Sequence, residues 1–116
     1  MIINDEAVEY TLEAEKGNPN ASVFLLKEIT CGVSFRVQNE ATYIDDKGKY
    51  RVKLGEAQKI QLTSCLVGWR NVKNKKGEDL AFTIENVMKL PPKVQTELNE
   101  AINLISIPKD DEIKNS

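Results

Sequence analysis

The side chains of this 116-residue chain that remain available for catalysis are carboxylates, lysines and tyrosines. The chain contains no histidine, which removes Ser–His–Asp triads, histidine general bases and most zinc sites. Paired carboxylates occur at Asp45–Asp46 and Asp110–Asp111, in a predicted turn and a predicted tail. A general acid needs a sheltered pocket that raises its pKa, and neither place provides one. Lysines also occupy the positions where a calcium-binding loop would need oxygen ligands. We therefore expect no enzymatic activity, no cofactor and no metal site.

The two cysteines, Cys31 and Cys65, lie in apolar patterns and belong to no CxxC motif. The first ten residues, MIINDEAVEY, lack the basic-then-apolar layout of a secretion signal. No apolar run approaches the roughly 18 residues of a membrane span. We therefore expect a cytoplasmic protein whose thiols are reduced and buried.

Length and composition are those of one folded domain, with 41% hydrophobic and 29% charged residues. We predict an α+β domain over residues 1–107, in which one or two β-hairpins pack with about three helices in a helical C-terminal half. Residues 108–116 are predicted to form a charged, flexible tail.

The N-terminal half alternates apolar and polar residues in the manner of strands. Residues 7–15 and 22–29 are predicted strands, joined into a hairpin by the dense turn signal at 16–20. Residues 43–52 form a second candidate hairpin around a DDKG turn, in which Gly48 can take a positive φ. Residues 30–41 fit either a helix capped by Thr30 or a strand, and we favour the helix.

The pattern in the second half is helical. Leu62, Cys65, Leu66 and Trp69 fall at i, i+3, i+4 and i+7, which predicts a helix over residues 56–69. A polar loop follows at 71–79, and Thr83 is a suitable cap for a short helix through residue 90.

A last helix opens at Pro91–Pro92 and ends before Pro108. Its apolar stripe consists of Val94, Leu98, Ala101, Ile102 and Ile105. We expect this stripe to pack on the 62–69 stripe, unless one of the two stays partly open for a partner helix.

Basic residues follow the only tryptophan, Trp69, and a second basic series alternates at Lys47, Lys49, Arg51 and Lys53. If the two series lay side by side, they would form a positive patch for phosphate or an acidic protein. Nucleic-acid binding is disfavoured, because the net charge is −2 and no aromatic residues are interleaved. A solvated face or a protein contact remains.

A tryptophan on an apolar helix face is more often core than a partner anchor, although Trp and Arg are enriched in interface hot spots. The candidate protein-binding residues are Trp69, Arg70, Asn71, Lys73, Lys75, Lys76 and Leu98. We hypothesise that Trp69 and Leu98 lie near the binding surface.

An ordered series of short motifs runs through the chain: VFLLKEIT at 23–30, LVGWRN at 66–71, a polar turn with Gly77, then Phe82, LP at 90–91, EL at 97–98 and Ile102. This series resembles small proteins encoded among the tail genes of long-tailed bacteriophages. In that group a "GLVGW-x-N" helix end, a polar Gly turn and an "LP…EL…AI" helix recur in this order. The CGVS stretch at 31–34 departs from the group, which usually has an Arg/Glu-rich helix there.

The resemblance implies a non-catalytic tail assembly chaperone in the host cytoplasm. Such chaperones bind tape-measure or tail-tube protein during morphogenesis and are absent from the finished tail. Two alternatives stay open: a structural virion component, such as a head–tail or tail-completion protein, and a phage-encoded inhibitor of a host defence protein. No membrane partner is expected, and a homo-oligomer stays open.

Overall fold

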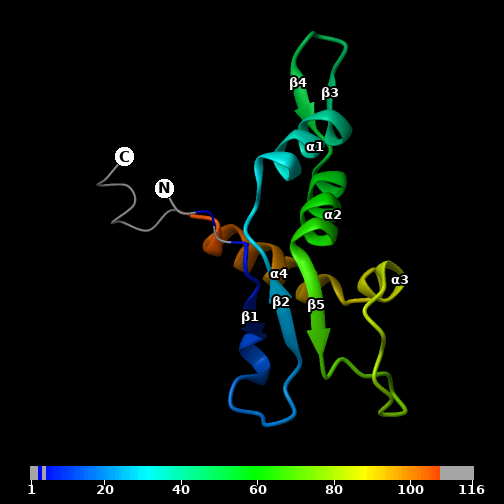
Figure 1. The fold of residues 1–116 in the computed structure, drawn as a ribbon. Helices are drawn as coiled ribbons and strands as arrows, with labels where there is room; N and C mark the ends of the chain where they lie inside the picture. The colour runs from blue at the N-terminus through cyan, green and yellow to red at the C-terminus, as the bar shows by residue number, and fades with distance from the viewer. Residues whose placement is uncertain (1–2, 4, 108–116) are drawn as a thin grey trace.

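Helices and two small antiparallel sheets make this an α+β protein, as predicted (Figure 1). The computed structural model describes residue 3 and residues 5–107, so the predicted tail at 108–116 lies outside the described residues. In chain order, the elements are β1 (Val8–Thr11), the 3-10 helix η1 (Glu13–Glu15), β2 (Val23–Leu26), α1 (Cys31–Ala41), β3 (Thr42–Ile44), β4 (Tyr50–Val52), α2 (Leu54–Cys65), β5 (Leu66–Arg70), α3 (Ile84–Val87) and α4 (Pro92–Ile105).

The larger sheet has the strand order β1-β2-β5, with both pairings antiparallel. β1 and β2 form the first predicted hairpin, although β1 ends at Thr11, where residues through 15 were expected to be strand. Phe24 on the central strand lies opposite Tyr10 on one side and Trp69 on the other. Since cross-strand partners share a face, these three rings point toward the core side of the sheet.

The predicted helix through Trp69 is wrong, because α2 ends at Cys65 and the chain continues as strand β5. Leu26 lies opposite Leu66, whereas the preceding Leu25 lies opposite Gly68, so β5 contains one extra residue at this point. Such a bulge puts Leu66 and Trp69, three residues apart, on the same side of the strand. That spacing is also the spacing of one helix face, which is why the pattern was misleading.

Residues 31–41 are helical, as favoured from the sequence. The Thr30 side chain accepts a hydrogen bond from the Val33 backbone N–H at 3.4 Å and caps the first turn of α1. Thr83 does the same for α3 through the Asn86 backbone N–H at 3.1 Å. α1 packs against α2, which continues directly into β5.

The core lies where α2, α4 and the inner face of the larger sheet meet. Its buried members are Phe24, Leu26, Leu62, Cys65, Leu66, Val87, Leu98, Ala101 and Ile102. The two predicted apolar stripes thus pack on each other. Full burial of each Leu or Ile stabilises the fold by about 1.5–3 kcal/mol. Asn99, buried between α4 and α2, receives a 3.2 Å hydrogen bond from Gln61 Nε2.

The second hairpin, β3–β4, connects the C-terminal end of α1 to the N-terminal end of α2 and extends away from the core (Figure 1). We call residues 42–52 the arm. The predicted turn is present: Gly48 has φ +76°, and Asp45 accepts hydrogen bonds from the Lys47 and Lys49 backbone N–H groups. The Cα radius of gyration is 16.4 Å, against about 13 Å for a compact domain of this length.

In the part of the chain that the structure describes, no helix is both long and apolar enough to span a bilayer.

Candidate protein-binding site

Trp69 connects the core to an exposed aromatic ring. Its indole makes edge-on contacts with buried Phe24, at 6.3 Å between ring centroids, and with Phe82, at 5.1 Å. The indole Nε1 donates a 2.9 Å hydrogen bond to the Leu80 carbonyl. Trp69 is half-buried and Phe82 is 40% exposed, so the indole lies on the core side of the Phe82 ring. The tryptophan is therefore chiefly a packing residue with one edge near the surface.

The loop after β5 returns to Trp69 through its own hydrogen bonds. The Leu80 backbone N–H donates to the Val72 carbonyl at 2.8 Å, and Lys73 forms a 3.1 Å ion pair with Asp79. Gly77, with φ +80°, makes the tight turn at the tip, as the sequence predicted. This return places residues 80–84 beside the end of β5.

An apolar hollow, which we call the notch, lies where this returning segment meets α2 and α3. It has a volume of about 240 Å³ and is lined by Thr63, Leu66, Phe82, Thr83, Ile84 and Val87. Ile84 is 64% exposed and Met88 52% exposed, so apolar surface extends along α3 beyond the notch. Small-molecule sites usually enclose about 300–1,000 Å³. The notch is smaller and suits a single apolar side chain of a partner.

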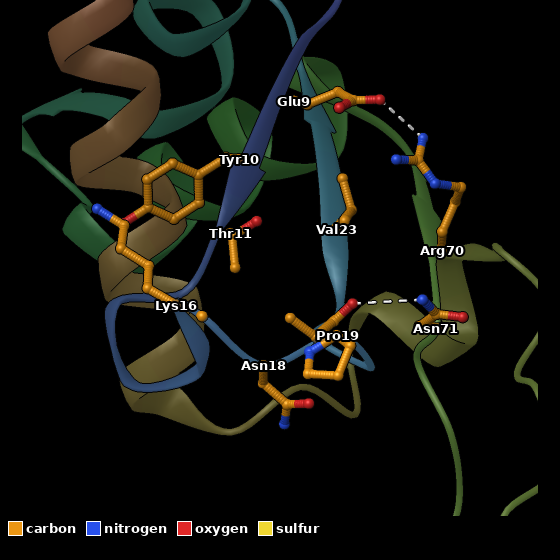
Figure 2. A pocket seen from close by; sticks show the side chains of 11 residues that line it. Glu9, Tyr10, Thr11, Lys16, Asn18, Pro19, Val23, Arg70 and Asn71 are labelled. Atoms are coloured by element: carbon orange, nitrogen blue, oxygen red, sulfur yellow. Dashed lines mark hydrogen bonds and ion pairs between the residues drawn. The ribbon is translucent and has the colours of Figure 1, made fainter.

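A second, wider hollow lies on the outer face of the larger sheet, at the end away from the arm (Figure 2). It has a volume of about 620 Å³ and is lined by Glu9, Tyr10, Thr11, Lys16, Gly17, Asn18, Pro19, Ala21, Val23, Arg70 and Asn71. Arg70 Nη1 lies 2.9 Å from Glu9 Oε1, across the strand β2. Asn71 has φ +58°, and its Nδ2 donates to the Ala21 carbonyl at 3.3 Å. These polar groups are engaged within the chain, so they hold the sheet and its loops together.

The remaining predicted site residues divide between the surface and the core. Lys75 and Lys76 are exposed at the loop tip. Leu98 is fully buried, so the hypothesis that it lies near the binding surface is wrong. The reason is that α4 directs its apolar stripe against α2 and the sheet.

The two basic series do not form one patch. The arm with its lysines lies at one end of the molecule, and the loop after β5 lies at the other (Figure 1). Arg51 forms an ion pair with Asp45 at 2.8 Å, which holds the pKa of that carboxyl below its usual range. The side-by-side arrangement that a joint phosphate-binding patch required is absent from the described residues.

The two thiols differ in their surroundings. Cys65 is buried in the core, and burial raises the pKa of its thiol, which disfavours the reactive thiolate. Cys31 is exposed, so the prediction that both cysteines are buried is wrong for this one. Cys31 is the first residue of α1, and the first turn of this helix begins on the solvent-exposed surface. Among the described residues, no group of three or more Cys, Asp or Glu side chains is placed to hold a metal ion.

Sequence reasoning missed Phe82, Ile84 and Met88 as surface residues. The available signal was the predicted short helix after Thr83, because a helix of one turn can bury few of the apolar side chains around it. In the structure α3 (84–87) buries Val87 and leaves Ile84 exposed. No family model matches this sequence, and no curated protein or solved structure matches it either.

Proposed function

We propose that the protein is a non-catalytic tail assembly chaperone that binds tape-measure or tail-tube protein through the notch. The observation that best supports this is the exposed apolar surface of residues 82–88. Phe82 and Ile84, which are 40% and 64% exposed, line a hollow of side-chain size, and Met88, one helical turn after Ile84, is 52% exposed. Contiguous exposed apolar surface is typical of protein–protein contact sites.

An amphipathic helix is the partner shape that fits this surface. A helix presents apolar side chains at i, i+3, i+4 and i+7, and one of them can enter the notch between Phe82 and Ile84. A neighbouring side chain of the same helix would then lie on Met88. Glu85 and Lys89, on the same short segment, are exposed and provide a polar rim of both signs.

The small size of the surface favours transient binding. Stable interfaces bury about 1,600 Å² in total, and weak encounters bury less than about 1,200 Å². A single notch with a few flanking residues belongs to the weak class. Reversible capture of this kind is what a chaperone needs, since it must release its partner to the growing tail.

The test is affinity capture of the tagged full chain from infected cells, together with mass spectrometry of purified virions. We expect tape-measure or tail-tube protein in the captured fraction and no copies of this chain in virions. Stoichiometric copies in virions would instead support a structural component. A tight one-to-one complex with a host protein, without tail proteins, would support the inhibitor alternative.

A further inference from the structure

A groove with an acidic rim lies between the first hairpin and α4. It has a volume of about 520 Å³ and is lined by Tyr10, Glu13, Glu97, Glu100, Ala101, Leu104 and Ile105. Leu104 is an apolar side chain that is 69% exposed. Glu97 Oε2 accepts hydrogen bonds from the Tyr10 hydroxyl at 2.6 Å and from the Glu13 backbone N–H at 2.9 Å, which fixes one side of the groove.

The carboxylates give this groove a negative field. Burial and the hydrogen bond to Glu97 raise the pKa of the Tyr10 hydroxyl, and the charges of Glu97, Glu13 and Glu100 raise it further. Lys16 pairs with Glu13 at 2.6 Å. Among the described residues, no Lys or Arg forms an ion pair with Glu97 or Glu100, so this side of the groove keeps its charge.

The arm has the opposite character. Ile44 lies opposite Tyr50, and Thr42 lies opposite Val52, so these four side chains share one face of the hairpin. Ile44 is 60% exposed, Tyr50 81% and Val52 58%. Lys47 and Lys49 in the turn form no ion pair with any described carboxylate. Arg51 pairs with Asp45, so Lys47 and Lys49 against Asp46 leave the arm with a net charge of +1. The arm therefore combines an uncovered apolar face with a small excess of positive charge near its tip.

The arm has little of its own chain to pack against. Its strands contact each other, and β3 contacts the end of α1. Figure 1 shows it extending away from the sheet and from α4. An isolated two-stranded hairpin is marginally stable in water. A second copy of the chain supplies both features that the arm lacks, an apolar floor and acidic rim groups.

We propose that the arm of one copy docks in the acidic groove of a second copy. Tyr50 lies on the apolar floor beside Leu104, which brings Lys47 in the turn to Glu97 and Glu100, while Lys49 adds positive charge from the opposite face of the arm. Because the arm and the groove are different surfaces, the contact is head-to-tail, and repetition gives a ring or an open chain of copies. This self-association is independent of the proposed chaperone function and can be tested separately.

Sedimentation velocity of the full chain measures the association directly. We expect assembly with rising concentration between about 10 μM and 1 mM, which is the range of a weak contact. Raising the salt from about 50 mM to 500 mM should reverse it, since the charged rim is exposed and screened. A chain that stays monomeric throughout at low salt would overturn the proposal.

Charge reversal locates the contact. We expect the K47E/K49E double variant and the E100K variant each to raise the midpoint concentration for association by about tenfold. In a mixture of the two variants, the intact arm of E100K can dock in the intact groove of K47E/K49E, so association should return as a mixed dimer. Circular dichroism and a thermal melt confirm that each variant is folded. Association that neither variant weakens would rule out this interface.

Zero-length carboxyl–amine crosslinking of an equimolar mixture of 14N- and 15N-labelled chain provides a direct readout. We expect mixed-isotope crosslinks between Lys47 or Lys49 and Glu97 or Glu100. Mixed-isotope crosslinks found exclusively elsewhere would show that the copies meet through another surface.

Discussion

The Trp69→Phe substitution tests the packing that supports the notch. It removes the indole N–H that donates to the Leu80 carbonyl at 2.9 Å and keeps a ring between Phe24 and Phe82. Loss of the hydrogen bond costs about 1 kcal/mol. A phenyl ring also buries roughly 40 Å² less apolar surface than an indole, which costs about 1 kcal/mol more. We therefore expect the free energy of unfolding to fall by about 2 kcal/mol.

Urea unfolding followed by far-UV circular dichroism measures this loss. At about 4 °C per kcal/mol for a domain of this size, the melting temperature should fall by about 8 °C. Tyr50→Phe is the matched control, because the Tyr50 ring is 81% exposed and the variant should match the wild type. If the free energy of unfolding of Trp69→Phe stays within about 0.5 kcal/mol of the wild-type value, the hydrogen bond from Trp69 to Leu80 does not stabilise the fold as argued.

Substitutions at Leu98 and Asn71 and a titration of Asp45 test three separate parts of the fold. Leu98→Ala should lower the free energy of unfolding by about 2–5 kcal/mol in urea titrations, because the side chain is fully buried. Asn71→Ala should cost about 2 kcal/mol, since it loses the bond to the Ala21 carbonyl and since alanine adopts the positive φ of +58° less readily than asparagine does. Asn71→Gly should cost less, because glycine accepts that φ. The bond from Arg51 lowers the folded-state pKa of Asp45. The Arg51–Asp45 ion pair therefore stabilises the arm fully above the unfolded Asp pKa of about 3.9. This stabilisation is lost as the pH falls through the lower pKa that Asp45 has in the folded state. NMR titration of the Asp45 carboxyl should show this depressed midpoint, and an ordinary midpoint would contradict the Arg51 contact.

Local signals were sufficient for much of the fold. Pro91–Pro92 followed by a long apolar stripe predicted the last helix, and α4 runs from Pro92 to Ile105. The DDKG turn predicted the second hairpin, and Thr30 and Thr83 act as the predicted helix caps. Each of these features depends on residues close together in the sequence, so the pattern alone carries the information.

The elements that were missed depend on contacts distant in sequence. β5 is a strand because Leu66 and Trp69 pair with Leu26 and Phe24 of β2, far earlier in the chain, through a register with a bulge. The spacing of the apolar residues is the same as on one face of a helix. The one local signal against a helix is that Val67 and Gly68 are poor helix formers. Tertiary pairing decided the structure.

The candidate site was predictable in part. The loop after Trp69 was correctly placed at the surface, but which of its side chains were already paired could not be read from the sequence. Arg70 is engaged by Glu9, a residue on the far edge of the sheet. The notch needs α2, β5 and α3 together, so no single segment shows it.

Quantitative affinity capture with two matched variants tests the proposed function most directly. Ile84 on the notch and Phe35 on α1 are 64% and 60% exposed, so Ile84→Asp and Phe35→Asp change similar amounts of surface. We expect Ile84→Asp to reduce capture of tape-measure or tail-tube protein from infected cells by about tenfold, since a hot-spot side chain is worth more than 1 kcal/mol. Phe35→Asp should leave capture unchanged. Undiminished capture by folded Ile84→Asp would contradict the assignment of the notch as the binding surface.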